Sequence, residues 1–274
     1  MTQPDRQEKK VEQELEAEVS RETSVHGQNW AGMYDGYFSD PSIAQPFVEE
    51  VLSVAGTEPP ECIVDLGGGT GFLLGQVLRQ APDGVSWRLL DMDLSEVQLA
   101  QVKDPRIATL RQSMMEFTRD SLGAGKDATV LFITRSTLHY AGLFGLEPLL
   151  KHIRAQMRAG EYFIHHTVCC EAPEEALLLS ELFERMGTGK WIPPVKSIES
   201  CCRQAGMEVI RERPMAPLVM AASVVGERYK QAPERMREIG QTLESGYEHP
   251  SLVQDHPSGY VFSAPYKLFT CRAV

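Results

Sequence analysis

Glycines at every second position, directly after a short apolar run, constrain this chain more than any other feature. The apolar run is residues 62–64, the turn is Asp65-Leu66-Gly67-Gly68-Gly69-Thr70-Gly71, and residues 72–80 carry apolar side chains at helical spacing. A strand-to-helix turn needs such residues when a ligand presses on bare backbone, because glycine lacks a Cβ and tolerates positive φ. The segment therefore predicts a strand, a ligand-binding turn and a helix.

Strands and helices alternate along most of the chain. The expected strands are residues 62–64, 86–90, 107–110, 129–134, 162–168, 207–211 and 266–272, and the expected helices are 46–54, 72–80, 95–102, 146–158, 173–186, 195–205 and 233–243, with a helical turn at 117–122. Such a succession calls for a mostly parallel sheet with helices on both faces. We therefore expect a doubly wound α/β fold.

Composition changes divide the chain into three parts. Residues 1–24 are rich in Glu and Lys and predict a charged tail or a frayed helix. Residues 25–58 begin with aromatic side chains, including Trp30, Tyr34 and Phe38, and predict a helical segment that closes over a site as a lid. Residues 59–274 carry the alternating pattern, and a chain of 274 residues suits one large domain with decorations.

The charge of the chain limits its partners. A formal net charge of −11 disfavours phosphate backbones and anionic lipid surfaces, so we expect neither a nucleic acid nor a membrane partner. No stretch approaches the roughly 18 to 20 apolar residues of a membrane span, and the N-terminus lacks a signal-peptide core. A cytoplasmic protein that acts on a small molecule is expected, and the oligomeric state stays open, a homodimer included.

The cysteines and the paired histidines predict core positions. Six cysteines include the adjacent pairs Cys169-Cys170 and Cys201-Cys202 but no CxxC spacing, so we expect buried reduced thiols and no metal site. His165 and His166 lie in the expected strand 162–168 and face opposite ways, so at most one of them can line a site. We place both in the core or on the surface.

Acidic residues on both sides of the glycine turn indicate the kind of ligand. Asp65, two residues before the first glycine, suits an α-ammonium group better than a phosphate. The glycine spacing also departs from the dinucleotide pattern G-x-G-x-x-G, because Phe72 stands where its last glycine would be. An acid within residues 91–93 can accept both hydroxyls of a ribose. The ligand is therefore predicted to be a zwitterionic nucleoside.

These residues resemble the class I S-adenosylmethionine-dependent methyltransferases, in which an acid and GxGxG form the first loop and an acid ending the second strand binds the ribose. The likeness spans about residues 45–212 in the expected order of elements. It includes residues 127–140 as the fourth strand with its loop, 158–161 as the turn before the fifth strand and 201–207 as the start of the sixth. The resemblance implies a seven-stranded sheet, and S-adenosylmethionine as the cofactor bound by residues 59–274.

The resemblance also implies the residues of the cofactor site. Asp93 is the ribose ligand with Asp91 in reserve, Ser113 stands where the family often has an aspartate, and Tyr34 reaches from the lid toward the donor carboxylate. The full set is Tyr34, Asp65, Gly67, Gly68, Gly69, Gly71, Asp93, Leu94, Ser113, Met114 and Thr134, with Met92 and Leu94 beside the adenine and Met114 using its backbone N–H.

His139 is the candidate general base. The glycine turn is similar to that of hydroxyl-methylating O-methyltransferases, in which a histidine after the fourth strand takes the proton, and His139 matches its place. The next residues, Tyr140-Ala141-Gly142, replace the usual Asp-Trp pair, and the N-terminal dimerisation domain of that family is not matched. A histidine satisfied within a core or loop is the alternative interpretation.

The activity implied is in-line SN2 transfer of a methyl group to a small-molecule acceptor, with a hydroxyl as one candidate group. The acceptor pocket is expected between the N-terminal aromatic segment, the loop after the fourth strand and the helices between residues 173 and 205, with Trp191. A non-catalytic module that binds S-adenosylmethionine or S-adenosylhomocysteine is the main alternative. A nicotinamide-dependent oxidoreductase and methylation of a thiophilic element held by the cysteine pairs are the others.

Overall fold

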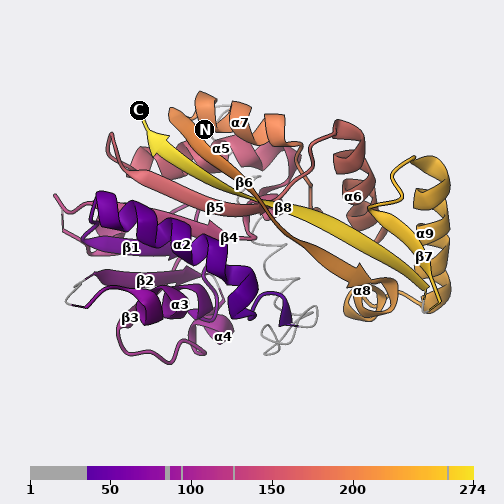
Figure 1. Cartoon of the computed structure of the whole chain (residues 1–274), viewed down its shortest axis with the longest axis horizontal. Coiled ribbons are helices and arrows are strands. Elements are labelled where there is room, and N and C mark those ends of the chain that lie inside the picture. The colour runs from indigo at the N-terminus through magenta and orange to yellow at the C-terminus, as the bar shows by residue number, and fades with distance from the viewer. Residues whose placement is uncertain (1–35, 84–86, 94, 126, 258) are drawn as a thin grey trace, which may run out of the picture.

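The computed structural model describes residues 36–83, 87–93, 95–125, 127–257 and 259–274 (Figure 1). Strands are β1 (Cys62–Leu66), β2 (Arg88–Asp93), β3 (Ile107–Arg111), β4 (Val130–Arg135), β5 (Tyr162–Val168), β6 (Met207–Ala221), β7 (Val253–His256) and β8 (Gly259–Ala273). Helices are α2 (Pro41–Thr57), α3 (Phe72–Gln80), α4 (Glu96–Leu99), α5 (Gly142–Gln156), α6 (Pro173–Arg185), α7 (Val195–Gln204), α8 (Ala222–Arg228) and α9 (Pro233–Gly246), with 3-10 turns η2 (Asp120–Leu122) and η3 (Leu138–Ala141).

All described strands belong to one sheet with the order β3-β2-β1-β4-β5-β8-β6, and β7 pairs with β8 outside this path. Strands β1 to β5 run parallel, whereas β8 runs antiparallel to β5, β6 and β7. In this register Asp65 on β1 lies beside Asp91 on β2. The expected mostly parallel, doubly wound sheet is confirmed.

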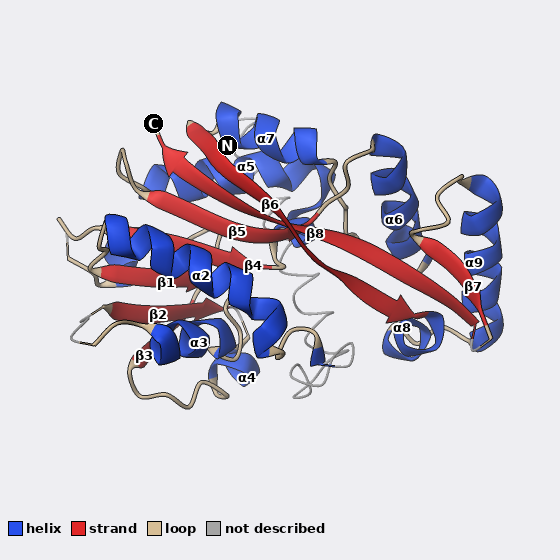
Figure 2. Cartoon of the chain, viewed as in Figure 1, coloured by secondary structure: helices blue, strands red, loops and turns tan. Residues whose placement is uncertain are grey.

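Helices cover both faces of the parallel strands because side chains of a strand alternate between the faces. Ile63 of β1 packs with Phe47 of α2 and Leu74 of α3 on one face, whereas Val64 packs with Leu149 of α5 and Ile198 of α7 on the other. Figure 2 shows these helices on the two sides of the sheet. Within the described ranges no helix combines the length and the apolar character that crossing a membrane requires.

The helix α2 begins five residues before the expected start at Pro46. Asp40 caps it by accepting a hydrogen bond from the Ser42 backbone N–H at 2.7 Å, and Pro41 occupies the first turn, where no N–H is needed. Its Glu50 is 2% exposed and pairs with Arg211 and Arg213 of β6. The described part of the proposed lid segment, residues 36–58, therefore contains helix α2, which is held against the sheet.

The last third of the chain forms an extension that the sequence pattern predicted only in part. Strands β6 and β8 are each 15 residues long, and their far halves leave the parallel sheet as a ribbon, seen at the right of Figure 1. The ribbon, β7 and the helices α6, α8 and α9 enclose a second apolar core.

All seven expected strands are present, and β7, which was not expected, adds an eighth strand to the sheet. Helix α8 was not expected either. Strand β7 has only four residues, with three of them exposed, so no apolar alternation marks it. Strands β6 and β8 also run longer than the expected 207–211 and 266–272, because ribbon pairing rather than a local pattern extends them.

His165 and His166 are both buried, at 0% and 1% exposure, and they face opposite sides of β5 as expected. His165 stacks on Phe269, whereas His166 contacts Phe47 of α2. Burial lowers the pKa of His166 well below its ordinary value, and the nearby Arg135 lowers it further. Of the cysteines, Cys201 is half-buried and the other five are buried.

Replacing Gly240 of α9 with Ala tests the packing of the extension, because the added Cβ would lie 2.1 Å from a ring carbon of Tyr260. Overpacking outweighs the better helix propensity of Ala, so we expect the free energy of unfolding to fall by about 1 to 2 kcal/mol in denaturant titrations. Gly246→Ala, on the same helix with nothing within 4 Å, is the control and should lose nothing. Equal stability of the two variants would contradict this packing.

Candidate functional site

A pocket lies where the carboxyl ends of the parallel strands meet the extension. One end is formed by the glycine turn and the ends of β2 and β4, and the other by residues of α6, β6, β8 and the loop before α7. The lining includes Phe38, Asp65, Gly67, Gly68, Gly69, Met92, Asp93, Met114, Arg135, His139, Tyr140, Phe183, Lys190, Ile192, Leu218, Met220 and Tyr266. In open α/β sheets, ligands bind at this edge.

The glycine turn has the backbone that the sequence predicts. Gly67, Gly69 and Gly71 have φ of 75°, 74° and 73°, a region that other residues rarely adopt. Gly67 also donates its N–H to the Met92 carbonyl at 2.6 Å, which ties the turn to β2. A Cβ on Gly68 would stand 2.7 Å from Asp91 Oδ2 and 2.8 Å from Asp65 Oδ2. The turn therefore rests directly on both carboxylates.

Asp65 and Asp91 are buried acids beneath this turn, at 1% and 0% exposure. Burial raises the pKa of Asp65 well above its ordinary value, and the neighbouring Asp91 raises it further. Burial, aided by Asp93, raises the pKa of Asp91 to about 7, although the backbone N–H groups of Gly71 and Gly69 oppose this shift. Asp65 lines the pocket and its oxygens have no hydrogen-bond partner among the described residues, whereas Asp91 lies behind the lining.

Asp93 lies at the end of β2 and lines the pocket. Its Oδ1 accepts a hydrogen bond from the Ser95 N–H at 2.7 Å, and Ser95 in turn caps α4. Asp93 therefore does not cap the helix itself, and its carboxylate is held at the pocket edge. The candidate adenine neighbour Met92 also lines the pocket, whereas Leu94, like Tyr34, lies outside the described residues.

Three predicted residues lie behind the pocket surface rather than on it. Gly71 forms the N-terminal end of α3, and Ser113 is buried with its hydroxyl accepting from the Met115 N–H. Thr134 is buried and donates to the Leu66 carbonyl while it also bonds Thr137. Met114, in contrast, lines the pocket. The first three are placed to support the binding loops.

His139 lies in η3, directly after β4, and lines the pocket at 6% exposure. Its ring lies 4.2 Å from that of Tyr140, centroid to centroid, and its carbonyl accepts the Trp191 N–H at 3.3 Å. The imidazole is thus held at the pocket by its neighbours. Trp191 itself packs against the sheet core, and its neighbours Lys190 and Ile192 line the pocket instead.

Arg135 is a pocket residue that sequence reasoning missed. It ends β4, donates to the carbonyls of Tyr37 and Phe38 at 3.1 and 3.2 Å, and lies over the rings of both residues. The next residue, Ser136, has a φ of 59°, a conformation that is rare outside glycine and recurs at functional sites. Arg135 could have been predicted from the sequence, because it directly follows the expected strand 129–134 and so lies at the carboxyl end of a parallel strand.

Lys190 is the second missed residue, and it brings positive charge to the other end of the pocket. Its Nζ donates to the Tyr229 hydroxyl and lies 5.0–5.1 Å from the ring centroids of Tyr140, Phe183 and Tyr229. Lys190 is 7% exposed. It comes from an irregular loop between α6 and α7, so no periodic pattern indicated its position.

S-adenosylmethionine fits this arrangement of residues. The nearby Arg135 offsets the charge of the Asp65 carboxylate only in part, because burial still raises its pKa well above the ordinary value, and its oxygens have no hydrogen-bond partner among the described residues. An α-ammonium group would supply a further positive partner. The bare backbone of the turn leaves room for the ligand chain, and Asp93 offers acceptor oxygens for ribose hydroxyls. No cysteine is among the lining residues, so the described pocket gives no support to thiophilic-element chemistry.

Solved structures show the same fold at low sequence identity. The YcgJ protein of Bacillus subtilis matches 84% of this chain and 98% of its own, with 9% identity and a TM-score of 0.64. Geranyl diphosphate C-methyltransferase of Streptomyces coelicolor, solved with S-adenosyl-L-homocysteine, matches 88% and 81%, with 13% identity and a TM-score of 0.55. A Haloferax volcanii complex of a methyltransferase activator and a candidate methyltransferase matches 93% and 97%, with 17% identity and a TM-score of 0.57.

No family model and no curated protein matches the sequence. The structural matches confirm that the chain has the class I methyltransferase fold that the glycine turn and the element order predict.

The burial of Asp91 predicts a pH-dependent stability. Its pKa is about 7 in the folded chain. The value for an unfolded chain is about 3.9. The folded state therefore binds more protons between these values, so this group makes the free energy of unfolding fall as pH rises from about 4 to about 7. Asp91→Asn cannot titrate and should show a flatter profile in denaturant titrations across this range.

Asp83→Asn, at an exposed position, is the matched control and should follow the wild type. Parallel profiles for the wild type and Asp91→Asn would contradict the raised pKa.

Proposed function

We propose that this chain transfers a methyl group from S-adenosylmethionine to a small-molecule acceptor, with a hydroxyl as the acceptor group. The observation that carries the proposal is the Asp65 carboxylate, which lies buried beneath a bare glycine turn at one end of a largely apolar pocket. A cationic nucleoside compensates such a carboxylate, whereas a pyrophosphate would be repelled by it.

In this proposal the residues around the glycine turn would hold the donor. Asp65 would bind its α-ammonium group, and Asp93 would accept from the ribose hydroxyls beside Met92 and Met114. Arg135 is suited to the donor carboxylate, because a guanidinium has five N–H donors and the two backbone carbonyls that it contacts do not use them all. Gly71, Ser113 and Thr134 support the loops from behind.

The acceptor occupies the other end, between His139 and the residues of the extension. Solved structures of the same fold that hold geranyl diphosphate support a small molecule as the acceptor. Apolar walls formed by Leu218, Met220 and Ile192 exclude water from the reacting atoms. The positive charge of Lys190 stabilises negative charge that develops on an acceptor oxygen.

Methyl transfer requires the protein to position the donor and the acceptor and to remove the proton of the acceptor hydroxyl. When bound, S-adenosylmethionine would supply an electrophilic methyl group on its sulfonium, and transfer of that methyl group to the acceptor oxygen would leave S-adenosylhomocysteine. His139 takes the proton from the hydroxyl at its imidazole nitrogen. Arg135 and Asp65 hold the donor so that the oxygen and the methyl group stay in line.

Asp65→Asn tests the donor site, since the amide keeps the shape of the side chain and removes its charge. We expect the dissociation constant for S-adenosylmethionine to rise roughly 10- to 100-fold, the usual effect of losing a charged hydrogen bond. Isothermal titration calorimetry measures this change. Asp83→Asn at the exposed position should bind as the wild type does. An unchanged dissociation constant in Asp65→Asn would exclude its proposed contact with the ammonium group.

His139→Gln tests the base, once a screen with methyl-labelled S-adenosylmethionine across phenols, amines, thiols and carboxylates has identified an acceptor. We expect kcat to fall roughly 10²- to 10⁴-fold while the KM for the donor stays unchanged, because only proton removal is lost. His256→Gln on β7, an exposed position, is the control. Full activity in His139→Gln would remove the base from the mechanism, and donor binding without any accepted methyl group would favour a non-catalytic binding module.

A further inference from the structure

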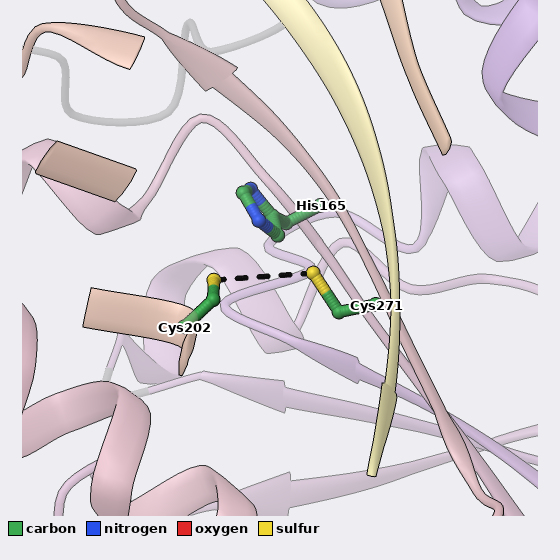
Figure 3. A group of neighbouring side chains, drawn as sticks. All are labelled: His165, Cys202 and Cys271. Atoms are coloured by element: carbon green, nitrogen blue, oxygen red, sulfur yellow. Dashed lines mark hydrogen bonds between the residues drawn. The ribbon is translucent and has the colours of Figure 1, made fainter. Parts of the chain in front are cut away.

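Three potential metal ligands from separate elements meet in the core, away from the pocket. His165 of β5, Cys202 of α7 and Cys271 of β8 point toward one another (Figure 3). Their ligand atoms all lie within 4.8 Å of one another, and the two sulfurs are 3.9 Å apart. None of the three residues lines the pocket. We refer to them as the His-Cys-Cys cluster.

His165 is held as a metal-binding histidine would be. Its ring stacks against those of Phe163 and Phe269, at centroid distances of 5.2 and 4.7 Å. Nδ1 bonds the Thr167 hydroxyl at 2.7 Å, while Nε2 is buried without a hydrogen-bond partner in the described part of the chain. At metal sites one ring nitrogen of a histidine usually forms a hydrogen bond with a neighbouring group and leaves the other nitrogen for the ion. Nε2 is therefore the nitrogen left for a ligand.

The distance between the sulfurs fits a shared ion better than a covalent bond. Two thiolates bound to Zn²⁺ at about 2.3 Å with tetrahedral angles are about 3.8 Å apart. Cys202 and Cys271 are 3.9 Å apart. A disulfide requires a separation of about 2.05 Å, which these two sulfurs do not have.

Charge balance indicates the valence of the ion. All three residues are fully buried at 0% exposure, where a net charge is costly. Two thiolates and a neutral imidazole together balance the charge of one divalent ion, and thiolate with imidazole is a donor set that suits Zn²⁺.

We propose that the His-Cys-Cys cluster binds one thiophilic divalent ion, Zn²⁺, which joins α7 to the sheet. The ion bridges β5, β8 and α7, so it stabilises the face of the sheet opposite α2 and leaves the pocket chemistry untouched. Because the cluster is buried, the ion is acquired during folding or through local opening of α7, and its exchange is slow. Binding releases the thiol protons that remain on Cys202 and Cys271.

Metal content tests the proposal directly. The full chain is produced with zinc, purified under reducing conditions without chelator and analysed by elemental mass spectrometry. We expect one zinc per chain and a rise in Tm relative to the metal-free protein. Refolding with Co²⁺ in place of zinc should give thiolate-to-metal charge-transfer absorption. A wild-type chain with no bound ion and no such absorption would overturn the proposal without reference to any variant.

Variants then identify the ligands by competition with a zinc-binding dye. We expect Cys202→Ser, Cys271→Ser and His165→Ala each to lower zinc affinity at least about 10-fold, and Thr167→Val to lower it about 10-fold by releasing Nδ1. Cys201→Ser changes the adjacent half-buried thiol and is the matched control with unchanged affinity. If a ligand variant does not fold, the zinc content of the wild type and the zinc affinity of Thr167→Val still test the proposal.

Equal zinc loss in Cys201→Ser and Cys202→Ser, or retained affinity in every variant, would overturn the assignment. So would a Cys202–Cys271 disulfide in chain purified without reductant, if the reduced chain took up no ion.

Discussion

The pocket depends on two carboxylates that the sheet buries side by side. Asp65 and Asp91 are in register on neighbouring parallel strands, and the glycine turn lies directly on them. Their burial disfavours the ionised forms, and a cationic group bound beside Asp65 would favour its ionised form. The same packing explains why Gly68 has no room for a side chain although its φ is ordinary.

The extension encloses the pocket at the carboxyl edge of the sheet and supplies the wall opposite the glycine turn. A parallel sheet alone would present the glycine turn to solvent, but the long ribbon of β6 and β8 brings Leu218, Met220 and Tyr266 opposite it. Glu50 of α2 pairs with Arg211 and Arg213 at the root of this ribbon and fixes its departure from the sheet. The glycine turn and the ribbon are thus opposite walls of one cavity, which the proposed function assigns to the donor and the acceptor.

Local sequence patterns predicted much of this structure, because backbone sterics and side-chain periodicity act between residues close in the chain. The glycine turn follows from backbone sterics, and each central strand carries enough apolar residues to be found, so β1, β4 and β5 lie close to their expected places. The placement of Asp65, Asp93 and His139 at the pocket follows from the rule that functional residues gather at the carboxyl ends of parallel strands. Weakly patterned elements such as β7 and α8 were missed.

The sequence by itself determined the strand–glycine turn–helix unit, the α/β alternation and the acids beside the turn, because steric freedom and side-chain periodicity act over a few residues. Only the tertiary structure decided the rest. Arg135 and Lys190 reach one pocket from segments 55 positions apart, and His165, Cys202 and Cys271 meet across a helix and two strands. Such meetings depend on strand order and on how the ribbon folds back, and long-range pairing leaves no mark in residue spacing.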